Sequence, residues 1–439
     1  MAARLILSKF ASGELSLDSR EPATHATDGQ PQASKACQFA ASAAPSEAGQ
    51  KPAPLRYSGS MSGTHPHSAA RRHAPRDYAR TPLNIYWEMT QACALACRHC
   101  RAEAVPDPHP LELTFDEGVG LLHQILEFGD PLPNLILTGG DPLARRDLYE
   151  LIDEAHRLGI STSITPAATE ALTRDVLVRL KEHAVEGLGL SLDGSNAARH
   201  DAIRGIPGTF DRTMQAIRWA QELEMPLQVN TLVSAETADD VPAVYELLKP
   251  YAVTRWSAFF LIAVGRGSVL EPLPPAEAEK LMAWIFEVSR AAPFIVATTE
   301  APSYRRVALE RMRAEGMSGA QIRSSGVYRG FGVRDGHGIV FVSHIGDICP
   351  AGFLPLVAGN VRADRLAQVY REAPLFEKLH DPARLEGRCG VCEYRTLCGG
   401  SRARAYAATG NPLATDPICE YEPRTAEEAA SHAGARRPA

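Results

Sequence analysis

The sequence predicts an α/β protein in which strands alternate with helices around a parallel sheet, followed by a small cysteine-rich domain. Three observations predict this class. From residue 82 onward, short apolar runs alternate with stretches of helical periodicity. One tight group of cysteines directly follows the first apolar run, and a second group lies near the C-terminal end. Six strand–helix units in succession form a parallel sheet with helices outside it.

The strands are expected at 83–90, 134–138, 160–165, 186–192, 227–233 and 255–261. A doubly wound sheet and a curved, incomplete barrel both satisfy this count. In either architecture, functional side chains lie at the carboxyl ends of the strands.

The helices between these strands are predicted by apolar spacing and by their end signals. Thr114 and Glu117 form a capping-box signature before the first helix. Gly159 supplies the stop for a second helix that begins near Leu148. Further helices are expected at 168–181, 209–223, 239–248 and 276–289, and a hairpin is expected around 338–343.

Composition divides the chain into five segments. Residues 1–80 are rich in Ala, Ser, Pro, His and Gly without a sustained period, so we expect a disordered leader there. A barrel core is expected at 81–265, a connecting segment at 266–335, a small iron–sulfur-stapled C-terminal domain at 336–425 and a disordered tail at 426–439.

Charge and hydropathy exclude several classes of function. The net charge of −6 gives no electrostatic footprint for nucleic acid. No apolar run approaches the roughly 20 residues that span a bilayer, and the N-terminal residues make a poor signal peptide. We therefore expect a cytoplasmic protein. The nine cysteines, an odd number in two tight clusters, indicate metal ligation rather than disulfides.

The first cluster has the spacing C-x3-C-x2-C, formed by Cys93, Cys97 and Cys100. Thiolates at these spacings converge on one metal centre from a single loop. Three thiolates leave one iron of a [4Fe-4S] cluster open to an outside ligand, as a catalytic cluster requires. Zinc would need a fourth ligand, and His99 is awkwardly placed for that because it adjoins Cys100.

A C-x3-C-x2-C loop after a first strand resembles the radical S-adenosylmethionine (SAM) superfamily. The resemblance implies an incomplete (β/α)6 TIM-like barrel. It also implies that SAM chelates the open iron and is cleaved by one electron to a 5′-deoxyadenosyl radical, which takes a hydrogen atom from the substrate. The chain would then be an enzyme of oxidoreductase or lyase type.

Further motifs extend the resemblance and imply contacts with SAM. The turn Gly139-Gly140-Asp141-Pro142 resembles the family's G-G-E-P motif, with a carboxylate that meets the amino group of SAM. The block S-L-D-G with a downstream H-D-x-x-R-G implies a serine at the ribose and an arginine near the SAM carboxylate. The resemblance also places His99 near the adenine of SAM. The other residues that it assigns to SAM are Ser191, Asp193, Arg204 and Asn230.

The second cluster comprises Cys389, Cys392, Cys398 and Cys419. Four thiolates at this spacing suit structural zinc or a [4Fe-4S] cluster. The arrangement resembles the SPASM extension of radical SAM enzymes, which carries auxiliary iron–sulfur clusters. Ser401 stands where a full SPASM domain has another cysteine, so one auxiliary cluster is expected. Cys349 is expected to be a buried small hydrophobe.

The motifs identify the superfamily more specifically than they identify the substrate. The blocks C-G-G-S-R-A-R-A-Y-A and R-H-C-R-A-E-A resemble radical enzymes that alter tetrapyrrole side chains in modified-haem biosynthesis. The expected substrate is therefore a tetrapyrrole, with a flavodoxin or ferredoxin as electron donor. One alternative is a maturase of a ribosomal peptide. Another is a non-catalytic iron–sulfur or zinc-binding protein, which leaves the three-cysteine loop unexplained.

Overall fold

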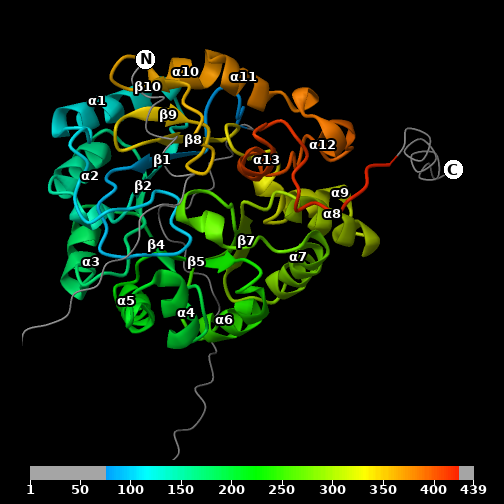
Figure 1. The fold of residues 1–439 in the computed structure, drawn as a ribbon, viewed down its shortest axis with the longest axis horizontal. Helices are drawn as coiled ribbons and strands as arrows, with labels where there is room; N and C mark the ends of the chain where they lie inside the picture. The colour runs from blue at the N-terminus through cyan, green and yellow to red at the C-terminus, as the bar shows by residue number, and fades with distance from the viewer. Residues whose placement is uncertain (1–75, 425–439) are drawn as a thin grey trace, which may run out of the picture. The chain divides into compact units, whose positions relative to one another are not determined.

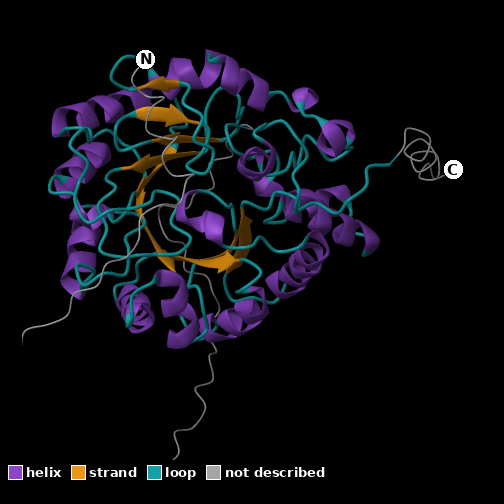
Figure 2. Cartoon of the chain, in the orientation of Figure 1, coloured by secondary structure: helices purple, strands orange, loops and turns teal. Residues whose placement is uncertain are grey.

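The computed structural model of the protein describes residues 76–424. The expectations for residues 1–75 and 425–439 lie outside the described residues. Figure 1 shows the order of the elements along the chain, and Figure 2 shows the strands as a curved sheet with helices on its outer side.

A single ten-stranded sheet has the order β10-β9-β8-β1-β2-β3-β4-β5-β6-β7. Strands β1 to β7 pair in parallel in chain order, β8 pairs in parallel with β1, and β9 and β10 extend that edge in antiparallel fashion. The strands are β1 (Asn84–Glu88), β2 (Asn134–Thr138), β3 (Thr162–Ile164), β4 (Gly187–Ser191), β5 (Leu227–Val233), β6 (Arg255–Phe260), β7 (Ile295–Thr299), β8 (Ile339–Val342), β9 (Asp347–Cys349) and β10 (Gly359–Asn360).

Thirteen α-helices connect or follow these strands in the described part of the chain. They are α1 (Phe115–Ile125), α2 (Leu148–Arg157), α3 (Arg174–Glu182), α4 (Ala197–Arg204), α5 (Thr209–Glu222), α6 (Val241–Leu248), α7 (Pro275–Ser289), α8 (Tyr304–Ala314), α9 (Gly319–Ser324), α10 (Leu366–Glu372), α11 (Pro374–His380), α12 (Gly387–Val391) and α13 (Arg402–Thr409). Among these residues, no helix is both long and apolar enough to cross a membrane.

The two faces of the sheet differ in chemistry, as alternation along each strand requires. In β1, Ile85 and Trp87 are fully buried. Trp87 faces the helices, since a side chain at Gly118 in α1 would lie 2.9 Å from its ring. Tyr86 and Glu88 therefore point to the inner face of the curve. The apolar face packs against the helices, and the inner face carries polar groups.

The expected α/β fold with an incomplete parallel barrel is confirmed, and all six expected strands are present. Two expectations were wrong in detail. The third helix begins at Arg174 rather than at residue 168, because the Thr173 hydroxyl caps it by accepting the amide N–H of Val176 at 3.3 Å. The sequence also predicted six parallel strands and a connecting segment from residue 266, whereas β7 adds a seventh parallel strand beside β6.

The expected hairpin lies at β8 and β9, and it belongs to the barrel sheet. Strand β8 pairs with β1, with Asn84 opposite Ile339 and Trp87 opposite Val342. The sheet therefore continues past residue 336, where the sequence suggested the start of a separate C-terminal domain. The five-part division of the chain stays a prediction.

Candidate functional site

The three-cysteine loop leaves the carboxyl end of β1, as expected for a functional loop of a parallel sheet. Arg266, in the segment after β6, holds this loop from the other side of the barrel. Its guanidinium donates to the carbonyl of Cys97 at 3.0 Å and to that of Ala104 at 3.0 Å. Its backbone N–H also donates to the carbonyl of Cys100 at 3.0 Å. The loop is thus fixed by residues far away in the sequence.

Each sulfur of this loop receives a hydrogen bond. The amide N–H of Leu95 donates to Cys93 at 3.3 Å, and the amide N–H of Ala104 donates to Cys100 at 3.5 Å. The guanidinium of Arg204 donates to Cys97 at 3.7 Å.

Burial raises the pKa of the Cys93 thiol to about 11. A bound metal overcomes this shift, because a coordinating thiol is deprotonated outright. Sulfurs that accept N–H donors fit an iron–sulfur cluster, whose properties depend on such hydrogen bonds.

The turn after β2 packs directly against the cysteine loop. The amide of Gly140 donates to the carbonyl of Thr90 at 2.7 Å, and the amide of Asp141 donates to that of Ala92 at 2.7 Å. A Cβ atom at Gly139 would lie 2.5 Å from the Thr90 carbonyl oxygen, and one at Gly140 would lie 2.5 Å from that of Ala92. Both positions therefore require glycine because the two backbones approach so closely.

Asp141 is buried, and both of its carboxylate oxygens already accept hydrogen bonds. One accepts from the amide N–H of Leu143 at 3.1 Å, and the other accepts from the Thr169 hydroxyl at 2.9 Å. Burial raises the pKa of this carboxyl, although these bonds oppose the shift. Pro142 then begins a short 3-10 helix, Pro142–Ala144. Asp141 thus links the loops that follow β2 and β3, and its contact with SAM stays a prediction.

His99, Asp193 and Arg204 form one cluster beside Cys97. Arg204 pairs with Asp193 at 2.7 Å, and the Nε2 atom of His99 lies 3.9 Å from the same carboxylate. Burial lowers the pKa of His99 to about 4, which leaves the ring neutral at pH 7. Its Nδ1 atom is buried without a hydrogen-bond partner in the described residues. This orphan nitrogen fits a site that binds a ligand.

Ser191 and Asn230 lie opposite each other on β4 and β5. The Asn230 side-chain oxygen accepts a bond from Gln228 at 2.8 Å. Within residues 76–424, no hydrogen bond joins the side chain of either residue to the cysteine loop. They lie two residues before Asp193 and Leu232, whose own hydrogen bond of 2.8 Å joins the ends of β4 and β5.

A buried ion-pair group beside the loop was not anticipated. Glu88, at the end of β1, accepts a bond from Arg101 at 3.2 Å and lies 3.0 Å from the Nδ1 atom of His344. The Arg101 guanidinium also stacks over the ring of Phe341, 4.5 Å from its centre. The only sequence signal was an acidic residue ending an apolar strand and a basic residue following Cys100.

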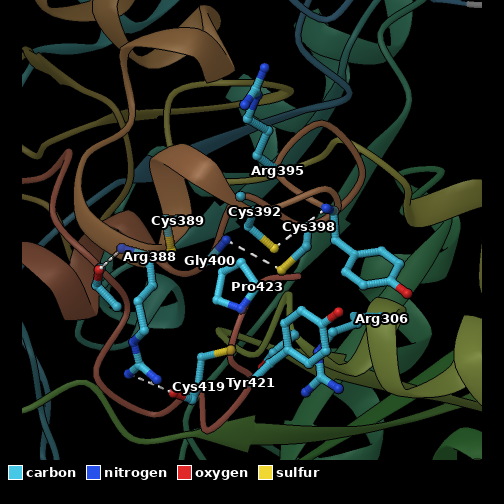
Figure 3. Close-up of a pocket in the computed structure, with 14 residues that line it drawn as sticks. Arg306, Arg388, Cys389, Cys392, Arg395, Cys398, Gly400, Cys419, Tyr421 and Pro423 are labelled. Carbon is cyan, nitrogen blue, oxygen red and sulfur yellow. Dashed lines mark hydrogen bonds between the residues drawn. The ribbon is translucent and has the colours of Figure 1, made fainter. Parts of the chain in front are cut away.

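The second group of cysteines lines one pocket. Cys389, Cys392, Cys398 and Cys419 all contribute to its wall. Figure 3 shows Cys392 and Cys398 directed toward each other, with Cys419 approaching from the opposite side.

Three of these sulfurs also receive donors. The amide of Tyr394 donates to Cys392 at 3.4 Å, the amide of Gly400 donates to Cys398 at 3.4 Å, and Arg402 donates to Cys389 at 3.7 Å. In the described residues, no three Cys, His, Asp or Glu side chains gather closely enough for a single metal ion. Cys349 lies apart in β9, where it is buried.

An incomplete barrel with a three-cysteine loop after its first strand defines a class of iron–sulfur enzymes that use SAM. Residues 87–248 match the radical SAM superfamily. The chain is 36% identical to the AdoMet-dependent heme synthase of Methanosarcina barkeri, over 78% of this chain and 97% of that protein. It is 35% identical to the AdoMet-dependent heme synthase of Nitratidesulfovibrio vulgaris, over 82% and 98% of the two chains.

The fold is also similar to that of Streptococcus suis SuiB bound to S-adenosylmethionine. The TM-score is 0.61 at 16% identity, over 78% of each chain. The protein therefore belongs to the radical SAM superfamily and is an enzyme.

Proposed function

We propose that the protein makes haem from a tetrapyrrole precursor by altering a side chain of the macrocycle. The observation that carries this proposal is the 36% identity to an AdoMet-dependent heme synthase over 97% of that protein's length. A tetrapyrrole also agrees with the sequence blocks around Cys100 and Cys398.

Cys93, Cys97 and Cys100 would hold the [4Fe-4S] cluster. The cluster and SAM together supply a 5′-deoxyadenosyl radical that removes a hydrogen atom from the substrate. Three thiolates would leave one iron of that cluster free to bind SAM, and Arg204 and the backbone amides of Leu95 and Ala104 would stabilise the thiolates.

The SAM site would extend from this loop across the carboxyl ends of β2, β4 and β5. Its residues would be His99, Gly139, Gly140, Asp141, Pro142, Ser191, Asp193, Arg204 and Asn230. The Nδ1 atom of His99 is buried and has no hydrogen-bond partner in the described residues, which supports the proposal that a ligand binds beside it. The close fit of the Gly139-Gly140 turn supports a shared wall between the two loops.

Cys389, Cys392, Cys398 and Cys419 would hold one auxiliary [4Fe-4S] cluster. Their position around one pocket and the N–H donors on three of the four sulfurs support this assignment. A flavodoxin or ferredoxin would supply the electron for SAM cleavage.

A ribosomal peptide is the alternative substrate. The similarity to SuiB concerns the fold alone, since the two sequences are only 16% identical. The tetrapyrrole is therefore the stronger proposal.

The test is an anaerobic assay of the reconstituted protein with SAM, dithionite and an iron porphyrin that carries propionate groups where haem carries vinyl groups. Haem and 5′-deoxyadenosine should both form, and the triple alanine variant of Cys93, Cys97 and Cys100 should form neither. Cys349→Ala, outside both cysteine sites, should retain both products. Formation of 5′-deoxyadenosine without any change in the porphyrin would contradict the tetrapyrrole substrate.

A further inference from the structure

We propose that Arg402 raises the reduction potential of the second cysteine site above that of the first, which makes the second site the better electron acceptor. This inference rests on the proposal that Cys389, Cys392, Cys398 and Cys419 hold an iron–sulfur cluster. In each cysteine site an arginine donates to one sulfur, but among the described residues only the arginine of the first site is also paired with a carboxylate.

Arg402 is a fully buried arginine whose guanidinium donates to a cysteine sulfur and makes no ion pair with a carboxylate in the described residues. Its side chain is 0% exposed. The guanidinium donates to the carbonyls of Pro412 at 2.9 Å, Ala414 at 2.7 Å and Gly400 at 3.3 Å, and to the sulfur of Cys389 at 3.7 Å. Carbonyls are neutral, so of these acceptors only the sulfur can carry a compensating negative charge.

Neither of the nearby carboxylates, Asp416 and Asp335, forms an ion pair with the Arg402 guanidinium. Asp416 pairs with Arg404 at 3.3 Å. Asp335 accepts the backbone N–H groups of Arg402 and Ala403, both at 2.9 Å, and makes no ion pair with the Arg402 guanidinium. A buried cation without an anion is costly. An anionic cluster bound through Cys389 would compensate it.

The first cysteine site supplies the contrast. Arg204 donates to Cys97 at 3.7 Å, the same distance as Arg402 to Cys389. Arg204, however, also pairs with Asp193 at 2.7 Å. The Arg204–Asp193 pair is neutral as a whole, whereas Arg402, which contacts its sulfur at the same distance, has no carboxylate partner among the described residues. Arg266 also lies at the first loop without such a partner, but its guanidinium donates to the carbonyls of Cys97 and Ala104 and to no sulfur. Because positive charge stabilises the more negative, reduced state of a cluster, the second site should have the higher potential.

Arg334 strengthens this difference. It is 3% exposed and donates to the carbonyls of Gly332 at 3.1 Å and Leu379 at 2.9 Å. It makes no ion pair with a carboxylate in the described residues. Its side chain packs against Gly399, the residue after Cys398, since a Cβ atom there would lie 2.8 Å from it.

The other arginines of the pocket contribute less. Arg306 is compensated by Glu279 and Glu310, and Arg388 pairs with Glu422 at 2.7 Å. Arg395 is directed away from the sulfurs (Figure 3) and donates to the carbonyl of Gly390. Arg395 therefore provides a matched control for Arg402.

The experiment is a redox titration of the anaerobically reconstituted protein, followed by electron paramagnetic resonance with iron counted in every sample. The triple alanine variant of the first loop identifies the signal of the second cluster. In the wild type, the second cluster should be reduced at the higher potential. Arg402→Gln should lower the midpoint potential of the second cluster and leave that of the first cluster unchanged. Arg402→Lys, which keeps the positive charge, should keep the midpoint of the second cluster close to the wild-type value. Arg395→Gln should change neither.

Asp193→Asn is the reciprocal variant, because it removes the charge that compensates Arg204. The Asn side-chain oxygen can still accept the Leu232 amide, which Asp193 accepts at 2.8 Å. The midpoint of the first cluster should rise. If Arg402→Gln does not fold, Arg334→Gln, Asp193→Asn and the order of the wild-type potentials still test the proposal.

Failure of the proposed role of Arg402 and failure of the proposed second cluster would give different results. About eight irons per chain, as two [4Fe-4S] clusters require, with an unchanged midpoint in Arg402→Gln would overturn the role of Arg402. A second cluster reduced at the lower potential in the wild type would do the same. About four irons in the wild type would instead refute the second cluster itself.

Discussion

Individual residues decide how closely the two loops of the proposed SAM site approach each other. Gly140 has no space for a side chain, because two backbone carbonyls of the cysteine loop would lie 2.5 Å from its Cβ atom. We expect Gly140→Ala to lower the free energy of unfolding by about 1–3 kcal/mol and to reduce SAM cleavage. Urea denaturation and 5′-deoxyadenosine formation measure the two effects.

Gly120 in α1 is the control for this substitution. Nothing lies within 4 Å of its Cβ position. Gly120→Ala should stabilise the protein by roughly 0.5–1 kcal/mol, since alanine is preferred inside a helix, and should leave SAM cleavage intact. Equal activity in the two variants would show that the contact between the loops does not matter.

Arg266 is the residue that fixes the cysteine loop from the far side of the barrel. Arg266→Ala removes the donors to the carbonyls of Cys97 and Ala104. At about 1 kcal/mol for each hydrogen bond, the loop should lose about 2 kcal/mol of stabilisation. Iron should then be lost faster to a chelator, as absorbance at the cluster bands would record.

Arg290→Ala, which removes an exposed ion pair with Glu315, should leave the rate of iron loss unchanged. If both variants lost iron at the wild-type rate, the hydrogen bonds from Arg266 to the cysteine loop would not be needed to retain the iron.

Sequence reasoning identified the residues of local motifs but not those that act across the fold. The cysteines and the Gly139-Gly140 turn stand in short patterns, so they could be predicted. Arg266 and Arg402 act on atoms brought near only by the folded backbone. An arginine looks the same in the sequence whether it binds water, a carboxylate or a cysteine sulfur. The contacts with SAM stay predictions.

At the scale of elements, apolar runs and caps were sufficient for most of the barrel. Strands β2 and β5 begin and end where the sequence predicted. Strand β7 was missed because none of its residues is fully buried, and it therefore lacks the continuous apolar run of an inner strand. The pairing of β8 with β1 could not be read from the sequence, because it depends on the closure of the fold.

The first helix depends on its N-terminal cap. The Thr114 hydroxyl accepts the amide N–H of Glu117 at 3.3 Å, and the Glu117 carboxylate accepts the amide N–H of Thr114 at 2.8 Å. We expect Thr114→Ala to destabilise the protein by about 1 kcal/mol, as measured by chemical denaturation. Thr396, an exposed turn residue, gives the matched substitution, and Thr396→Ala should stay within about 0.5 kcal/mol of the wild type. A neutral Thr114→Ala would mean that packing alone sets the start of α1.

At the scale of the whole molecule, buried histidines should make stability depend on pH. Burial, with the nearby charge of Arg334, lowers the pKa of His337 to about 3 and that of His380 to about 4. The unfolded chain takes up protons below about pH 6.5, whereas the folded protein does not until the pH nears those lower values. The free energy of unfolding should therefore fall as the pH decreases below 6.5, by up to about 1.4 kcal/mol per pH unit for each histidine.

The double variant His337→Gln, His380→Gln isolates this contribution. Its free energy of unfolding, from urea titrations between about pH 7 and pH 5, should decline less steeply than that of the wild type. His156→Gln, at an exposed position, should keep the wild-type slope. Parallel slopes for the double variant and the wild type would assign the acid sensitivity to other groups.

The pairing of β1 with β8 also means that β1 waits for its partner strand while the chain is synthesised on the ribosome. Ile339 lies roughly 250 residues after Asn84, its partner in the sheet. At ordinary translation rates, these residues emerge roughly 10 to 50 s apart. Throughout that interval, the strand that leads into the cysteine loop has one unpaired edge, which is prone to aggregation. A nascent chain that receives its iron before residue 342 has been translated would do so on an unfinished barrel.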